Sequence, residues 1–181
     1  MKGVIFNLLE DFIIESWGVA KYEQLLEQCP IHAHIPYVGP GTYPDANLLA
    51  IVDQVTAQLG VGTSEALRRF GRFSFPRLAN RFSVFVREHD HPKPFLKTVD
   101  GIIHVEVRKL FGDAAPPQIT CVDPAPDRLL MRYVSRRKLC AFFTGLLEGT
   151  GDYFKVPITQ AQTECALEGA ASCEFSLHFP T

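Results

Sequence analysis

A single histidine, His104, stands in an apolar stretch of the sequence where an imidazole could serve as a metal ligand. The segment Val99-Asp-Gly-Ile-Ile-His104-Val-Glu-Val107 has helical spacing, which places His104 on the same side as Ile103 and Val107. A hydrophobic wall with one nitrogen donor suits the axial ligand of haem iron, because the haem macrocycle is flat and apolar. The pattern also fits a histidine hydrogen-bonded within a protein core, so His104 alone leaves both interpretations open.

A polar triplet with alternate spacing, formed by Tyr133, Ser135 and Arg137, could bind carboxylates. Residues two apart in an extended chain face the same side, so the two hydroxyls and the guanidinium should converge. Haem carries two propionates, and burying a carboxylate without a charged partner is unfavourable. The triplet therefore suits a propionate site beside His104, and a polar strand face in water is the alternative interpretation.

The other histidines lack such a setting. His32, His34, His89 and His91 lie in short polar or proline-flanked segments, so we expect them to be exposed to solvent.

The overall composition limits the classes of protein to which the chain can belong. Its 181 residues suit one domain, and 46% hydrophobic residues exclude a disordered chain. A formal net charge of -2 argues against nucleic acid and against an anionic membrane surface as partners. No apolar run reaches the roughly 18 residues of a membrane-spanning helix, and Glu10 and Asp11 interrupt any secretory signal. Five cysteines are too sparse for a disulfide framework, so we expect a cytoplasmic protein.

Hydrophobic periodicity divides the chain into a helical first part and a mixed second part. Apolar residues recur at helical spacing, which predicts helices near residues 5–17, 48–59, 63–86 with a break at Pro76, 95–111 and 138–154. After Gly112, alternating patterns and turn residues predict short strands near residues 118–122, 128–135, 156–159 and 173–179. The predicted fold class is α+β, with N-terminal helices packed on a small antiparallel sheet that carries its own helix.

Together these residues resemble the H-NOX family, haem-binding sensors of nitric oxide or oxygen. Met1-Lys-Gly-Val-Ile5 is similar to the family's opening, and His104 before Lys109-Leu and Pro116-Pro117 is similar to its proximal helix. The triplet matches the family's Tyr-x-Ser-x-Arg motif in full. The resemblance covers nearly the whole chain and implies one domain over residues 1–181, with a distal subdomain over about 1–62, a proximal subdomain over about 63–181, and haem buried between them.

The resemblance also implies the residues around the haem. His104 would ligate the ferrous iron of haem b, Pro117 would press on the ring and bend it, and the triplet would clamp the propionates. The distal pocket implied by the resemblance is lined by Ile5, Leu9, Ser74, Leu78, Phe142 and Leu146. Oxygen-binding members carry a tyrosine at the position of Phe142. Bound dioxygen needs a hydrogen-bond donor, whereas nitric oxide bonds ferrous iron without one, so the resemblance implies a sensor of nitric oxide, which also binds carbon monoxide, and exclusion of dioxygen.

The implied activity is signalling and not catalysis. Nitric oxide would weaken the bond to His104, and the two subdomains would shift in response. The implied partner is a histidine kinase of a two-component system or a cyclic-di-GMP enzyme, either a diguanylate cyclase or a phosphodiesterase. One alternative is a haem enzyme, which would need distal acid-base groups where only Ser74 is polar. The other is a haem-free adaptor that binds an apolar small molecule or zinc, because residues 163–175 resemble the V4R domains.

Three cysteines form a second candidate site. Cys140, Cys165 and Cys173 match three zinc ligands found in one branch of the family, and three thiolates begin a tetrahedral structural site. That branch has a histidine as fourth ligand where this chain has Gln162, so the match is incomplete unless Glu164, His178 or another group takes its place. Reduced thiols and a redox switch between Cys165 and Cys173 are the alternatives.

Overall fold

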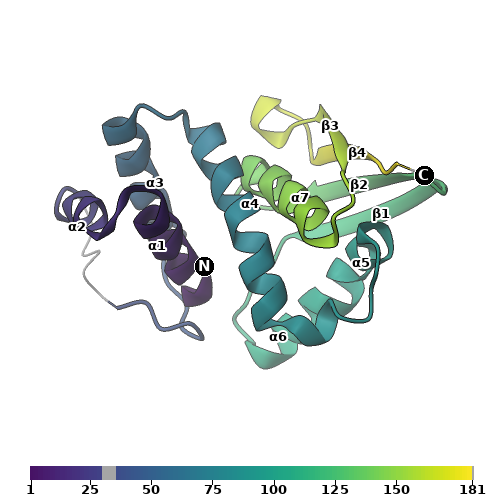
Figure 1. Cartoon of the computed structure of the whole chain (residues 1–181), viewed down its shortest axis with the longest axis horizontal. Coiled ribbons are helices and arrows are strands. Elements are labelled where there is room, and N and C mark those ends of the chain that lie inside the picture. Colours follow the sequence, from purple (N-terminus) through teal and green to yellow (C-terminus); the bar gives the residue numbers. More distant parts are fainter. Residues whose placement is uncertain (30–35, 181) are drawn as a thin grey trace.

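The computed structural model describes residues 1–29 and 36–180, and its first part is helical (Figure 1). α1 (Gly3–Trp17), α2 (Val19–Glu27) and α3 (Asp45–Leu59) enclose an apolar core to which Phe6, Ile13 and Leu48 contribute. Gly18 has a φ of 89°, which L side chains rarely adopt, and it joins α1 to α2. The helices expected near residues 5–17 and 48–59 are confirmed, and α2 is an additional helix that the apolar pattern did not predict.

At the centre of the molecule α4 (Thr63–Arg81) crosses α7 (Cys140–Phe154) at close range (Figure 1). Glycines make this approach possible. A Cβ at Gly145 would overlap the carbonyl oxygen of Arg68, and a Cβ at Gly71 would overlap the carbonyl oxygen of Phe142. The backbones of the two helices therefore touch directly, which fixes their crossing.

The predicted break at Pro76 is wrong, because α4 continues through this residue to Arg81. Pro76 has no N–H to donate to the carbonyl of Arg72, four residues earlier. A Cβ at Gly149 would lie only 2.7 Å from that carbonyl oxygen, so α7 covers the backbone group that the proline leaves without its helical partner. A short 3-10 turn, Ser83–Phe85, follows the helix.

Residues 92–110 form three pieces and not the single helix expected near 95–111. α5 (Pro92–Thr98) is followed by a π-helical turn (Val99–Ile103) and by α6 (His104–Leu110). The backbone N–H of His104 donates to the carbonyl of Val99, five residues earlier, which is the hydrogen bond that defines a π turn. The turn therefore changes the helical register immediately before His104.

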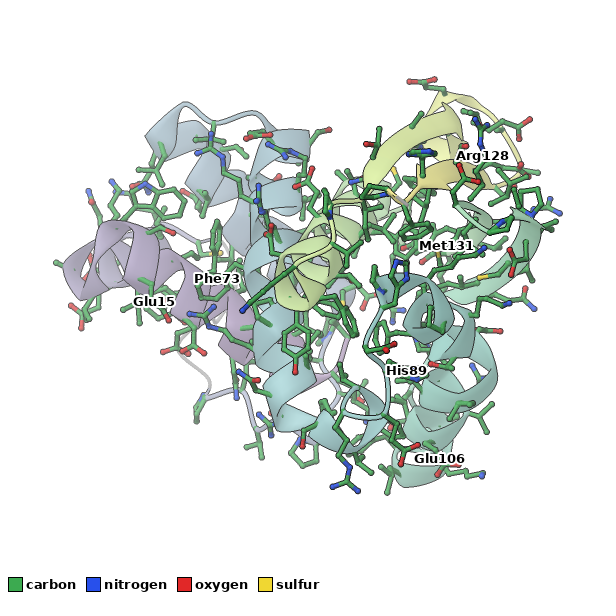
Figure 2. All side chains as sticks on the ribbon, turned by 45° about the vertical axis from the view of Figure 1, so that its right-hand side comes forward. Glu15, Phe73, His89, Glu106, Arg128 and Met131 are labelled. Carbon is green, nitrogen blue, oxygen red and sulfur yellow. The ribbon has the colours of Figure 1, made fainter. Side chains whose placement is uncertain are left out.

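The second part of the chain contains a four-stranded antiparallel sheet in the order β1-β2-β4-β3. The strands are β1 (Gln118–Ala125), β2 (Arg128–Val134), β3 (Thr159–Glu164) and β4 (Cys173–His178). Leu129, Met131 and Tyr133 alternate on the buried face of β2, and Figure 2 shows Met131 within this half of the molecule. The sheet and the α+β class are confirmed.

The strand expected at residues 156–159 begins later, at Thr159. Lys155 ends α7 in the left-handed conformation, with φ at 56°, and the N–H of Val156 still donates to the carbonyl of Gly151. This helix-terminating turn occupies the residues that would otherwise start the strand.

The side chains form two apolar cores. The N-terminal core joins α1, α2 and α3 to part of α4, and the C-terminal core joins α5, α7 and the sheet. Among the residues that the structure describes, no helix combines the length and the apolar character needed to cross a bilayer.

Two of the histidines that were expected to be exposed to solvent are partly covered. His89 and His91 are half-buried and not exposed: the ring of His89 lies 5.9 Å from that of Phe95, and Nδ1 of His91 accepts a hydrogen bond from the N–H of Lys93. His32 and His34 lie outside the described residues.

Candidate functional site

A cavity of about 350 Å³ is lined by residues of both cores. Its volume lies in the range of small-molecule and cofactor sites, and its lining is mostly hydrocarbon. Most of the site residues expected from the sequence line this cavity, namely Ile5, Leu78, His104, Pro117, Tyr133, Ser135, Arg137, Phe142 and Leu146. Residues that are more than 100 positions apart in the sequence thus face the same space.

One wall of the cavity, here named the histidine wall, consists of Val99, Ile103, His104 and Val107. Nδ1 of His104 lies 3.3 Å from Oδ1 of Asp100, and the carbonyl of Pro117 also forms a hydrogen bond with the ring. Burial lowers the pKa of His104, although Asp100 acts in the opposite direction. The imidazole is therefore neutral at neutral pH, which is the form that binds a metal ion.

A second wall, here named the apolar wall, consists of Ile5, Leu78, Phe142 and Leu146. None of these four side chains has a hydrogen-bond donor. Two residues that the sequence analysis assigned to this pocket do not line the cavity. Leu9, one turn beyond Ile5 on α1, is buried in the N-terminal core, and the hydroxyl of Ser74 is fully buried and donates to the carbonyl of Phe70 at 2.7 Å.

The polar triplet lies at the cavity where β2 ends. Tyr133 is buried on the core face, its hydroxyl is hydrogen-bonded with Ser135, and burial raises the pKa of Tyr133, which keeps the phenol protonated. Oγ of Ser135 accepts a hydrogen bond from the N–H of Arg137 at 3.2 Å. Nη1 of Arg137 donates to the carbonyl of Ala115 at 2.5 Å. All three polar groups therefore line the same cavity.

Asp45, at the start of α3, forms an ion pair with Arg137. The sequence did not indicate this acidic residue as part of the site. Nε of Arg137 donates to Oδ2 of Asp45 at 2.8 Å, and the Met1 ammonium donates to Oδ1 at 2.7 Å. Burial opposes the ionisation of Asp45, but these two cations outweigh it and hold the pKa of the carboxyl below its usual value. Asp45 and Arg137 are 92 positions apart, so no local sequence pattern could have paired them.

A second long-range ion pair lies at the same cavity. Nζ of Lys2 lies 2.5 Å from Oδ1 of Asp113, in the loop after α6, and 5.0 Å from the ring centre of Phe111. Lys2 and Asp113 both line the cavity. The start of the chain and the loop that follows His104 are thus joined electrostatically.

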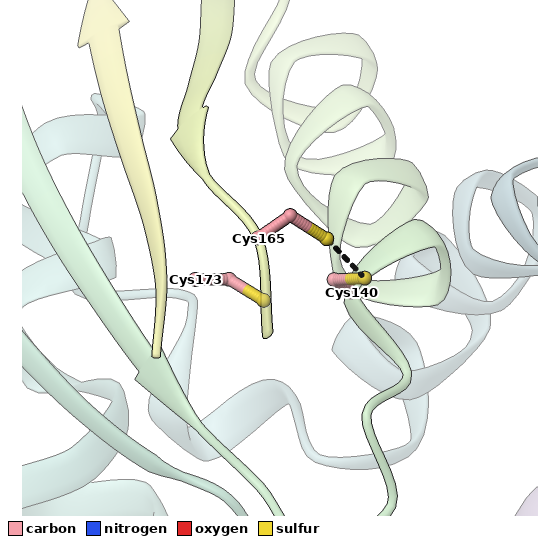
Figure 3. Close-up of side chains that lie close together, drawn as sticks. All are labelled: Cys140, Cys165 and Cys173. Carbon is pink, nitrogen blue, oxygen red and sulfur yellow. Dashed lines mark hydrogen bonds between the residues drawn. The ribbon is translucent and has the colours of Figure 1, made fainter. Parts of the chain in front are cut away.

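The three cysteines converge at a separate place, between the start of α7 and the sheet (Figure 3). The Sγ atoms of Cys140, Cys165 and Cys173 all lie within 4.8 Å of one another, and those of Cys140 and Cys165 are 3.8 Å apart. Burial raises the pKa of Cys140 to about 12. Burial acts in the same direction on Cys165, but neighbouring backbone N–H groups and Cys140 outweigh it and lower that pKa.

Within the described part of the chain, no further histidine, cysteine or carboxylate joins the thiol cluster. Gln162, which stands where one branch of the family has its histidine ligand, donates from Nε2 to the carbonyl of Glu164, and its side chain also forms a hydrogen bond with Cys165. His178 lies at the far end of β4 and pairs with Asp127 at 3.1 Å. The described residues therefore bring three thiols together, one group fewer than a tetrahedral structural zinc site needs.

The main cavity has the donor set that haem requires. A macrocycle with an iron atom and two carboxylates needs a neutral nitrogen ligand, an apolar surround and cations at one edge. His104 meets the first requirement and the apolar wall meets the second. The guanidinium of Arg137 meets the third, because Asp45 and Ala115 occupy only two of its five N–H donors.

Comparison with known proteins agrees with this geometry. The model of the family described as HNOB, haem-NO-binding, matches residues 2–162. An H-NOX protein from S. oneidensis in the Fe(II)NO state is 30% identical, with a TM-score of 0.93 and all of both chains covered. A histidine-to-glycine mutant of an H-NOX domain from Shewanella oneidensis in the Fe(II)CO state is 29% identical, with a TM-score of 0.90, covering 100% of this chain and 99% of that chain.

A more distant structure, the Fe(II) unliganded H-NOX protein from K. algicida, shares the fold at 23% identity, with a TM-score of 0.87 and coverage of 100% of this chain and 97% of that chain. None of the curated proteins matches the chain. The family model covers most of the sequence, and the fold and the cavity agree with it. The chain therefore belongs to the H-NOX family of haem-binding gas-sensor domains, which are not enzymes.

Proposed function

We propose that this domain senses nitric oxide with a haem b held by His104 and that it excludes dioxygen. One observation carries the proposal: the cavity that presents a neutral imidazole on one wall presents only hydrocarbon on the apolar wall. The haem supplies a ferrous iron that binds the gas. The discrimination between gases comes from the side chains around it.

Exclusion of dioxygen follows from the missing donor. Bound dioxygen gains from a hydrogen bond to its outer oxygen, and Phe142 and Leu146 cannot supply one. Two hydroxyls near this wall are already engaged. Ser74 donates to Phe70, and Thr150 donates to the carbonyl of Leu146 at 2.7 Å. Nitric oxide needs no such donor, so the apolar wall favours it.

The remaining site residues have positioning roles in this proposal. Tyr133, Ser135 and Arg137 would hold the propionates, and Pro117 would contact the ring beside His104. The lining from both cores supports treating residues 1–181 as one functional unit, with about 1–62 and about 63–181 as its two subdomains. A gas that changes the bond at His104 would then shift one subdomain against the other.

The proposed partner is a histidine kinase or a cyclic-di-GMP enzyme, which the family resemblance supports. The test is the activity of the candidate enzyme with the ferrous protein and with its nitric oxide complex. A difference that disappears in His104→Gly supports the proposal. Equal activities for both forms contradict signalling to that enzyme.

The optical spectrum of His104→Gly tests the haem ligand directly. We expect the Soret band of the purified protein to be lost or strongly changed in this variant and to return when imidazole is added. His89→Gly is the matched control, because His89 does not line the cavity and should leave the spectrum unchanged. If the spectrum of His104→Gly is the same as that of the wild type, His104 is excluded as the ligand and the proposal is contradicted.

For the thiol cluster we propose that Cys140, Cys165 and Cys173 are reduced thiols, because no fourth metal ligand accompanies them among the described residues and burial raises the pKa of Cys140. Zinc binding through the three sulfur atoms, with a fourth ligand from outside the cluster, is the alternative that their convergence supports. Metal analysis of protein purified without chelators should find less than half an equivalent of zinc per chain. About one equivalent of zinc that falls in Cys165→Ser would favour the zinc site instead.

A further inference from the structure

Asp100 is placed to act on the imidazole of His104 from within the π turn. The two residues are four positions apart, so their side chains lie one above the other on the helix. Oδ1 of Asp100 is 3.3 Å from Nδ1 of His104. The π hydrogen bond from His104 to Val99 sets the register that brings them together. Both side chains are largely covered, with exposed fractions of 15% for His104 and 28% for Asp100.

Within residues 1–29 and 36–180, the carboxylate of Asp100 forms no other side-chain hydrogen bond or ion pair. Among the described residues, no lysine or arginine forms an ion pair with it. The nearby lysines of α5 are directed to another acid, since Nζ of Lys97 and Nζ of Lys93 both pair with Asp123. The carboxylate therefore remains available to accept the N–H of the imidazole.

We propose that Asp100 is a positioning residue for the gas-sensing site: it accepts the Nδ1–H of His104, fixes the tautomer in which Nε2 is free to coordinate, and makes that nitrogen a stronger donor. The inference rests on the proposed role of His104 as haem ligand. Carboxylates commonly orient metal-bound histidines in this way and raise their basicity. A stronger imidazole donor resists the loss of its bond to iron, so Asp100 would set how readily gas binding releases His104.

The test measures the iron–histidine stretching band of the ferrous, unliganded protein by resonance Raman spectroscopy. Asp100→Asn keeps the shape of the side chain and weakens the acceptor, and Asp100→Ala removes it. We expect the band to shift to lower frequency in Asp100→Asn and further in Asp100→Ala, and the reduction potential of the haem to rise in the same order. The Pro117 carbonyl is a backbone group and stays present in every variant.

Glu106→Gln is the matched control. Glu106 lies on α6 (Figure 2), its carboxylate pairs with Lys109 at 2.6 Å, and its substitution removes the same charge without touching the imidazole. The band should stay at the wild-type frequency in this variant. Asp100 variants that match Glu106→Gln in both band and potential would overturn the inference.

Failure of the proposed function gives a different result. A wild-type protein without an iron–histidine band, or with a band that survives in His104→Gly, would contradict His104 as ligand. If the wild type has an iron–histidine band that vanishes in His104→Gly, but the frequency of this band does not change in the Asp100 variants, only the inference about Asp100 is contradicted. If Asp100→Ala does not fold, the shift in the isosteric Asp100→Asn decides the question.

Discussion

The histidine wall and the apolar wall of the cavity differ in both chemistry and construction. The histidine wall comes from one short segment, the π turn and α6, and places a carboxylate and a carbonyl beside its imidazole. The apolar wall is assembled from α1, α4 and α7, and its four side chains have no polar atom. In the proposed function, the histidine wall would supply the coordinating nitrogen, and the apolar wall would offer a bound gas no hydrogen bond.

Under the proposed function, this difference would let a single cavity bind a gas and still discriminate between gases. The strength of coordination would depend on the imidazole and its partners, which lie close together in the sequence. Discrimination between gases would depend on a missing hydrogen-bond donor on helices from distant parts of the chain. A change on one wall should therefore alter one property and leave the other nearly intact.

Adding a donor to the apolar wall should have the largest effect. In Phe142→Tyr the new hydroxyl can donate to bound dioxygen, at a gain of about 1.5–3 kcal/mol, which corresponds to about 10- to 150-fold slower dissociation of dioxygen. Stopped-flow measurement of that rate is the check. Phe73→Tyr is the control, because Phe73, labelled in Figure 2, lies on α4 and is not among the residues that line the cavity. Stable binding of dioxygen by the wild type would show that the wall already has a donor.

Removing the cation at the cavity edge should have a smaller effect. Arg137→Ala leaves a propionate poorly paired, and we expect a cost of about 1.5 kcal/mol, or roughly tenfold faster loss of haem to an acceptor protein. The lower end of the range for charged hydrogen bonds applies because Asp45 and Ala115 already share this guanidinium. Arg136→Ala, an exposed neighbour, should lose haem at the wild-type rate. Equal rates in both variants would remove Arg137 from the propionate site.

The sequence was informative where the chemistry is local. His104 in its apolar stretch and the Tyr133-x-Ser135-x-Arg137 spacing led to residues that line one cavity. Three features could not be predicted. The π turn follows from a change in hydrogen-bond register that has no periodic signal, and the Asp45–Arg137 pair joins residues 92 positions apart. Whether Leu9 and Ser74 line the cavity or lie buried in the protein core depends on how the helices pack, and a helical sequence pattern does not specify that packing.

The smallest expected effect concerns Asp45, which joins the N-terminal helices to the edge of the cavity through Arg137. Its pKa is depressed in the folded protein, so its stabilising contribution is complete above the unfolded pKa of about 3.9 and is lost as the pH falls through the folded pKa. Asp45→Asn should therefore lower the free energy of unfolding at pH 7 by less than about 1 kcal/mol, because the carboxylate is about a third exposed.

Urea unfolding of haem-free wild type and Asp45→Asn at several pH values checks this prediction. The difference in unfolding free energy should be constant near neutral pH, begin to shrink at about pH 4, where the carboxyl of the unfolded chain becomes protonated, and approach zero below the lower pKa of the folded protein. Asp53→Asn, an exposed change on the same helix, should follow the wild type throughout. A difference that persists unchanged in acid would mean that Asp45 acts through its shape, and the electrostatic link between the N-terminal helices and the cavity edge would have to be abandoned.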